Sequence, residues 1–340
     1  MIVRSCRFFW ILLLLTAFNS CQPDNDPEIE PTDPPTDLEY VCEPLPIFTP
    51  ELRLQPYTHI GNRYATPTFS PLDSNMIAME KYSGYLLIYD IGKQELVYES
   101  EDLGFITGKP DWGENNIICF PNLQSDLVYF LDIDGFTLTR VSLGSTKYTE
   151  WLNDSTIIFF QDGGRYGWHL LTYNYFSGEV ATLVADAGNL LTSTDSYNKK
   201  YGKILIATEA NMAYYNIFTN TFHDGPYSGS TEKPLFSVWH PRGDRVYYLK
   251  SSGFYYYDYT TESEHSIKES CDTRYYHSFD ISKDGNTVIA ELHQQWIDKA
   301  PEAHQYEEIN GMWNYYNTHI VTFGLDGSNE KIVLEGVLDK

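Results

Sequence analysis

Aromatic, amide and carboxylate side chains are concentrated between Gln294 and Asn317. The aromatic residues of this segment are Trp296, Tyr306, Trp313, Tyr315 and Tyr316. Aromatic rings can stack on a sugar or peptide, and neighbouring amides and carboxylates can hydrogen-bond its polar edges. One interpretation of this composition is a glycan- or peptide-binding lid over one end of the central channel. The same aromatic residues could instead pack against one another as a small core that plugs one end of the fold.

Four further candidate ligand-binding residues carry, or can carry, a positive charge: Arg63, Arg165, Arg274 and His277. The chain has a formal net charge of −24, so cations gathered on one face would attract a carboxylate-bearing ligand. An acidic sugar or a peptide terminus would fit this description. Taken singly, a loop cation is more often a solvated charge with no specific partner.

Sequence motifs of common catalytic and metal sites are missing. We find no nucleophile elbow, zinc-protease pair, phosphate-binding loop or dinucleotide fingerprint, and the nine histidines are scattered. The segment from Asp280 to Glu291 matches a calcium loop at its main ligand positions, but strands are expected on both sides where an EF-hand has helices. We therefore expect no catalytic residue, no metal site and no cofactor. Paired catalytic carboxylates drawn from distant repeats remain an alternative.

A repeat of 42 residues organises the chain. Its markers, each 42 positions after the last (132 − 90 = 42), are Asp90, Asp132, Asn174, Asn216 and Asp258. Short apolar runs at such a period predict an all-β fold, a six-bladed β-propeller with four-stranded antiparallel blades. The expected blades cover approximately residues 64–100, 108–144, 148–185, 190–224, 235–268 and 275–336.

The sixth repeat is longer than the others. Its marker is expected at position 300 (258 + 42), but the matching residue is Gly324, an excess of 24. The surplus is the aromatic segment 294–317, between the second and third strands of the blade. In a propeller this connection lies on the same face as the loops between blades, so the aromatic segment and the candidate cations should meet there.

Three segments carry a resemblance to a known family. Residues 239–249 (Trp-His-Pro-Arg-Gly-Asp-Arg-Val-Tyr-Tyr-Leu) resemble the Trp-Ser-Pro-Asp-Gly-Lys repeat of TolB-like propellers. Residues 129–135 and 321–327 resemble the third strand and turn of that repeat. The likeness to TolB-like six-bladed propeller lipoproteins of Gram-negative bacteria covers most of residues 60–336. It implies the architecture and is almost silent on activity, because one propeller scaffold hosts unrelated functions.

The N-terminal residues read as a targeting signal. Basic residues precede an apolar run that leads to Cys21, so we expect residues 1–21 to be a lipoprotein signal peptide ending at the lipidated cysteine. Phe18 replaces the usual aliphatic residue of the lipobox, and an ordinary secretory signal is the alternative. Residues 22–40 hold five Pro and seven acidic residues, which predicts a disordered tether before a single domain at 41–340.

These features set the expected location and partners. We expect a protein of the outer membrane, lipid-anchored, on the cell surface or the periplasmic face. Its acidity argues against nucleic acid, which is bound by clustered Lys and Arg. The expected function is non-catalytic binding or scaffolding of a glycan, peptide or envelope protein on the face of the 294–317 insertion. The alternative is a glycan-active lyase or hydrolase at the mouth of the channel. Spacing leaves open whether Cys42, Cys119 and Cys271 are bridged or free.

Overall fold

A computed structural model describes residues 64–81, 84–104, 108–122, 125–162, 168–185, 197–207, 212–223, 234–271, 274–298, 308–309 and 312–336. The chain divides into two units, Met1–Leu38 and Glu39–Lys340. All described residues belong to the second unit. The expected signal peptide and tether lie outside the described residues.

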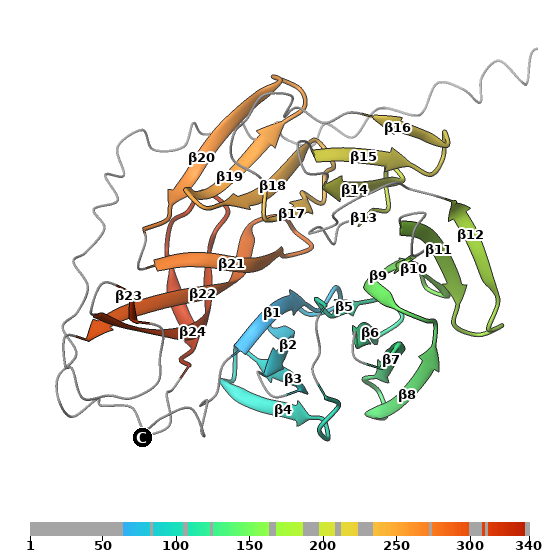
Figure 1. The fold of residues 1–340 in the computed structure, drawn as a ribbon, viewed down its shortest axis with the longest axis horizontal. Helices are drawn as coiled ribbons and strands as arrows, with labels where there is room; N and C mark the ends of the chain where they lie inside the picture. The colour runs from blue at the N-terminus through green and yellow to red at the C-terminus, as the bar shows by residue number, and fades with distance from the viewer. Residues whose placement is uncertain are drawn as a thin grey trace, which may run out of the picture. The chain divides into compact units, whose positions relative to one another are not determined.

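The described residues form six antiparallel sheets arranged as the blades of a β-propeller (Figure 1). The predicted fold class is confirmed. In the first five blades the strands follow one another from the innermost to the outermost, and each pairs with the next. Within the described part of the chain, no helix is long and apolar enough to cross a membrane.

Blades one to three contain β1 (Tyr64–Phe69), β2 (Met76–Lys81), β3 (Tyr85–Asp90), β4 (Glu95–Glu99), β5 (Asp111–Trp112), β6 (Ile117–Asn122), β7 (Leu127–Asp132), β8 (Thr137–Ser142), β9 (Thr146–Asn153), β10 (Thr156–Asp162), β11 (Trp168–Asn174) and β12 (Val180–Val184). Blades four to six contain β13 (Tyr197–Asn198), β14 (Lys203–Ala207), β15 (Met212–Asn216), β16 (Thr221–His223), β17 (Phe236–Trp239), β18 (Arg245–Lys250), β19 (Gly253–Asp258), β20 (Ser263–Glu269), β21 (Arg274–Ile281), β22 (Thr287–Asp298), β23 (Glu308–Ile309), β24 (Met312–Gly324) and β25 (Lys331–Leu334).

The residues that mark the 42-residue period each end the third strand of a blade. Their side chains accept backbone N–H groups of the turn that follows. Asp90 Oδ1 accepts from Lys93 N at 2.9 Å, and Asp258 Oδ1 accepts from Thr260 N at 2.7 Å. Asp and Asn stabilise such turns because their short side chains reach the backbone two or three residues ahead. The 42-residue period therefore arises because successive blades place an Asp or Asn that stabilises a turn at the same position.

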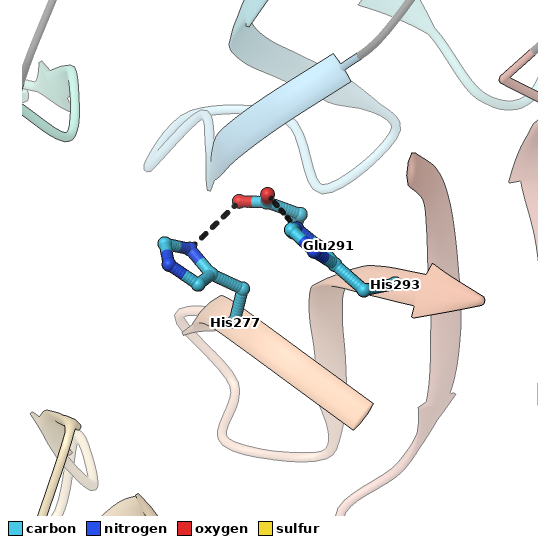
Figure 2. Close-up of side chains that lie close together, drawn as sticks. All are labelled: His277, Glu291 and His293. Carbon is cyan, nitrogen blue, oxygen red and sulfur yellow. Dashed lines mark hydrogen bonds and ion pairs between the residues drawn. The ribbon is translucent and has the colours of Figure 1, made fainter. Parts of the chain in front are cut away.

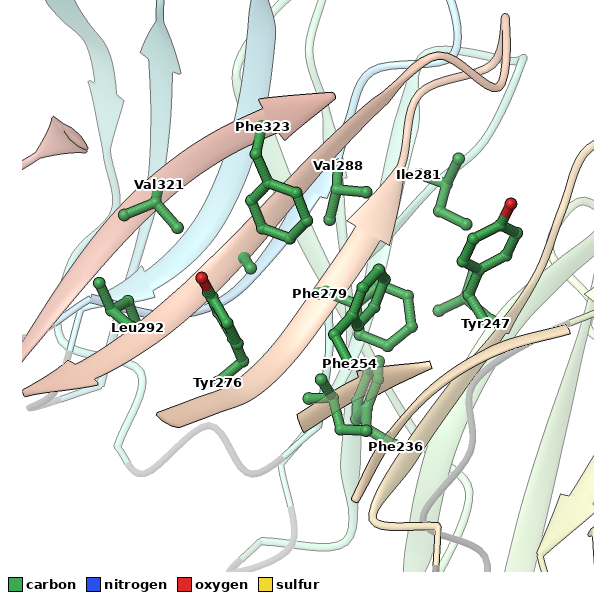
Figure 3. Packing of buried hydrophobic residues seen from close by; sticks show 13 residues of the cluster. Phe236, Tyr247, Phe254, Tyr276, Phe279, Ile281, Val288, Leu292, Val321 and Phe323 are labelled. Carbon is green, nitrogen blue, oxygen red and sulfur yellow. The ribbon is translucent and has the colours of Figure 1, made fainter. Parts of the chain in front are cut away.

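Aromatic side chains fill the space between neighbouring blades. Between blades five and six, Phe254 packs edge-on against Phe279 and Phe323, with ring centroids 4.8 and 5.6 Å apart (Figure 3). Edge-to-face pairs of this kind add about 0.5–1.5 kcal/mol beyond the burial of their area. Each sheet can bury both faces only against its neighbours, so this packing requires the ring to close.

Closure brings β1 against blade six. Asp280, on β21, accepts hydrogen bonds from Thr68 Oγ1 and from Phe69 N, both at 2.9 Å. Its other carboxylate oxygen pairs with Lys109 Nζ at 2.9 Å, and that ammonium is almost fully buried. One carboxylate thus joins blade six to blade one and to the segment that enters blade two.

Carboxylates join other neighbouring blades in the same way. Asp111 Oδ2 accepts from Trp151 N at 2.5 Å, and Glu150 Oε1 accepts from Tyr197 N at 2.5 Å. In each case a carboxylate on an innermost strand satisfies a backbone N–H of the next innermost strand. Hydrogen bonds to an ionised acceptor are stronger than neutral ones, which suits a junction that no sheet ladder spans.

The C-terminal segment completes blade six. β25 pairs with β24, opposite Ile320 to Thr322, and so supplies the outer strand of that blade. A short additional strand, β23, pairs with the far end of β24.

The described cysteines differ in state. Cys119 is a buried free thiol in the core between blades two and three, and burial raises the pKa of this thiol. Cys271 is disulfide-bonded, and its partner lies outside the described residues. Of the two cysteines among the described residues, one is thus a buried thiol and the other is bridged.

We expect Asp280→Asn to lower the free energy of unfolding by about 3 kcal/mol, because it removes the charge that compensates the buried Lys109 ammonium. Urea unfolding followed by fluorescence measures the change. Asp154→Asn, at an exposed turn carboxylate, is the matched control and should shift stability by less than about 0.5 kcal/mol. Equal stability of Asp280→Asn and wild type would show that closure does not need this charge.

Candidate functional site

A β-bulge on β21 places an extra residue beside a buried glutamate. Tyr276 lies opposite Leu292, and Ser278 lies opposite Glu291, which leaves His277 as the additional residue between these pairs. A bulge directs two consecutive side chains of one strand toward a single residue of its partner. His277 and Ser278 accordingly both approach the carboxylate of Glu291.

A second bulge, on β1, faces the same carboxylate. The register of β1 shifts between Ala65 and Thr68, and Thr66 has a φ of 47°. A β-branched residue is strained in this left-handed region, at a cost of about 1–3 kcal/mol. The distortion turns the Thr66 N–H out of the sheet ladder, and it donates to Glu291 Oε2 at 3.1 Å. Two neighbouring innermost strands thus bend to present donors to one side chain.

Glu291 is the centre of this cluster (Figure 2). Its side chain is only 3% exposed. Ser278 Oγ donates to Oε2 at 2.8 Å, and His277 Nδ1 lies 3.6 Å from the same oxygen. His293 Nε2 lies 2.5 Å from the other oxygen, Oε1. Both carboxylate oxygens are therefore engaged, as a buried carboxylate requires.

The electrostatics of the cluster favour an ionised carboxylate. Burial by itself would raise the pKa of Glu291, but the hydrogen bonds and charges of His277 and His293 outweigh burial and hold this pKa well below its usual range. In return, the interaction with Glu291 raises the pKa of His277, against the opposing effect of burial. A carboxylate and a proton-bearing imidazole thus stabilise each other.

The two imidazoles differ in orientation and exposure. His293 Nδ1 lies 3.1 Å from the hydroxyl of Tyr275, which fixes the ring of this nearly buried histidine. The His277 and His293 rings stack with centroids 5.0 Å apart. The His277 side chain is 62% exposed. The cluster therefore has a buried, oriented wall and one side open to solvent.

The surplus residues of the sixth repeat lengthen its strands. β22 and β24 have 12 and 13 residues, and their pairing continues to Asp298 opposite Trp313. Much of the expected loop is therefore a β-ribbon, defined here as residues 294–298 and 312–317. The ribbon continues the half of β22 that carries Glu291 and His293, so the cluster lies near its base.

The predicted aromatic residues are placed on this ribbon as far as the structure describes them. Trp296 lies on β22, opposite Tyr315 in the register, and Tyr316 is opposite Gln295. Trp313 is at the far end of the ribbon. Tyr306 lies outside the described residues.

The structure places the predicted positively charged residues in different surroundings. Arg274 is the first residue of β21, and its guanidinium pairs with Glu330, which also accepts from Lys268 Nζ at 2.7 Å. Its charge is therefore paired within blade six. His277 joins the cluster described above. Arg63 and Arg165 lie outside the described residues.

From the sequence, Glu291 is considered only as the last position of a rejected calcium loop, and His293 is not predicted as a site residue. Glu291 and His293 are separated by one residue, Leu292, and therefore lie on the same face of β22. This spacing could have been recognised in the sequence. The convergence of His277 on that face depends on the β21 bulge. A register shift of this kind leaves no distinct pattern in a single sequence.

A separate hollow of about 310 Å³ lies where several innermost strands end. Its lining includes the carboxylates of Asp111, Glu150 and Asp280. Each of these accepts a backbone N–H from the next blade, as described above. These groups are committed to holding the ring together, so the hollow is a weaker candidate than the histidine cluster.

Comparison with known proteins supports the architecture. No protein-family model matches the chain, and no curated protein matches it significantly. The structure of a putative TolB from Agrobacterium tumefaciens is similar, with 10% identity and a TM-score of 0.52 over 75% of this chain and 91% of that one. A chain in the crystal structure of the mitotic checkpoint complex has 12% identity and a TM-score of 0.49 over 67% and 71%. The likeness to the TolB structure extends to the fold, a six-bladed β-propeller.

We expect Glu291→Gln to lower the free energy of unfolding by about 1.5–3 kcal/mol at neutral pH, because donors from two strands are aimed at an ionised acceptor. Denaturant unfolding measures the loss. Glu95→Gln, at a largely exposed carboxylate on β4, is the control and should be nearly neutral. If both variants had wild-type stability, the carboxylate charge would have no structural role.

Proposed function

We propose that this protein is a lipid-anchored envelope protein without catalysis, which recognises a glycan, peptide or protein partner on the face that carries the 294–317 insertion. The observation that carries the proposal is the β-ribbon formed by the ends of β22 and β24. The propeller fold, shared with the TolB structure, is consistent with a binding or scaffolding role.

A paired ribbon suits recognition better than an open loop. Its backbone is held by a register that runs from the blade to Asp298 and Trp313, so less conformational entropy is lost when a ligand binds. The register holds the aromatic residues of the ribbon at fixed positions along the two paired strands. Aromatic platforms with adjacent amides recognise sugars and peptides alike.

A glycan-active lyase or hydrolase is the second candidate. The observation in its favour is the exposed His277 held beside Glu291, since a carboxylate that orients an imidazole is a common arrangement for general acid–base catalysis. This site would act at the mouth of the channel, at the base of the ribbon. Release of new reducing ends from a bound glycan would distinguish it from a pure binding module.

The ribbon should be required for ligand recognition. We expect wild-type protein to bind members of an immobilised array of glycans and peptides. A variant with residues 294–317 replaced by Asn-Gly should lose that binding at least tenfold. The replacement keeps His293 opposite Thr318 and closes a two-residue hairpin.

Phe176→Ala is the matched control for this experiment. Phe176 is 73% exposed in the turn between the third and fourth strands of blade three. The ribbon extends from the connection between the second and third strands of blade six, which lies at the opposite end of a blade. Removing the Phe176 side chain should therefore leave array binding unchanged. Retained binding by the ribbon-replacement variant would refute recognition by the 294–317 segment.

Membrane attachment should depend on Cys21. The supporting observations are the basic and apolar residues before this cysteine and the disulfide of Cys271, which suits an oxidising compartment. We expect Cys21→Ala to move the protein from the membrane pellet to the soluble fraction of the envelope after fractionation. Cys119→Ala, at a buried thiol, serves as the control. Firm membrane retention of Cys21→Ala would rule out the lipid anchor.

A further inference from the structure

We propose that His277, Glu291 and His293 bind a divalent transition-metal ion of the Zn²⁺ class. One ligand atom from each residue, two imidazole nitrogens and one carboxylate oxygen, lies within 4.8 Å of the others. This donor set is one that zinc prefers in proteins. Among the described residues it is the one group of three such side chains close enough to share an ion. The site stands on these contacts and does not depend on the proposed function.

The close contact between His293 and Glu291 requires a proton or a metal ion between the two atoms. Nε2 of the imidazole and Oε1 of the carboxylate are 2.5 Å apart, and both atoms carry lone pairs when unprotonated. A proton on Nε2 satisfies the contact in the metal-free form. A metal ion can take the place of this proton at Nε2.

Tyr275 makes this replacement possible. Its hydroxyl lies 3.1 Å from His293 Nδ1 and can accept the N–H of that nitrogen, which leaves the Nε2 lone pair directed at Glu291 and the ion. Metal-binding histidines usually have such a partner on the second ring nitrogen, because it fixes the tautomer and orients the ring. The supporting contact is therefore already in place.

The two bulges explain why the ligands converge. The bulge on β21 brings His277 Nδ1 to 3.6 Å from Glu291 Oε2. Ligand atoms bound tetrahedrally to one zinc ion are separated by about 3.3 Å, from bond lengths near 2.0–2.1 Å. The exposed His277 side chain can close its contact slightly, and the 2.5 Å contact between His293 and Glu291 must open, while Ser278 Oγ and Thr66 N hold the carboxylate.

The exposure of His277 also provides an entry path. Three protein ligands leave the fourth tetrahedral position of zinc open, as in sites where the ion meets water or another ligand. The buried His293 and Glu291 form the inner side, and the exposed His277 side chain forms the outer side. An ion can therefore reach the site without opening the propeller.

Isothermal titration of the chelator-treated, full-length chain in detergent with ZnCl₂ tests the site. We expect His277→Ala to reduce Zn²⁺ affinity at least tenfold, with the same loss in His277→Gln. His265→Ala is the control, because His265 lies on the outer strand β20 and stacks on Tyr256. It should bind as wild type does.

Cobalt substitution gives a second readout of the same site. Co²⁺ bound by wild type should develop the visible absorption of a tetrahedral ion, and His277→Ala should lose it. Metal-free melting temperatures of His277→Ala and His277→Gln check that both variants are folded. Absence of saturable Zn²⁺ binding by wild type would overturn the proposal. Wild-type affinity in both His277 variants would overturn it as well.

Discussion

A propeller blade is a sheet that must be covered on both faces, and its only available covers are the neighbouring blades. The ring must therefore close, and in this protein β1 closes it against blade six. Two carboxylates of blade six, Asp280 and Glu291, accept the backbone N–H groups of Phe69 and Thr66 across this junction. Within a blade, backbone hydrogen bonds join neighbouring strands, and this ladder ends at the innermost strand. At the junction between blades, the charge-assisted bonds take its place.

The candidate site is a consequence of how this junction is built. Glu291 can be buried as an anion because β1 and β21 each bulge to direct groups at it. The bulges place Thr66 in a strained conformation and expose His277. Departures from regular geometry that persist in a well-packed core concentrate at functional positions, where they present groups that a regular sheet would hide.

The site and the insertion share one structural support. Glu291 and His293 lie on β22, and the same strand continues with β24 into the ribbon. The ordered backbone of the ribbon thus begins beside the histidine cluster. A ligand held by the ribbon would lie close to His277, so recognition and metal binding would occupy one end of the same blade.

The sequence by itself determined the fold class and the position of the irregular repeat. Both depend on local chemistry: Asp90 and its four equivalents cap the turns after the third strands, and counting from Asp258 locates the surplus at 294–317. Tertiary structure decided the site. Glu291 meets Thr66 across 225 residues of sequence, and His277 reaches the carboxylate through a register shift. Likewise, the ion pair between Arg274 and Glu330 forms only in the folded blade. Turn contacts join residues only a few positions apart, so the local sequence is enough to predict them. The contacts of the site form only once the ring closes.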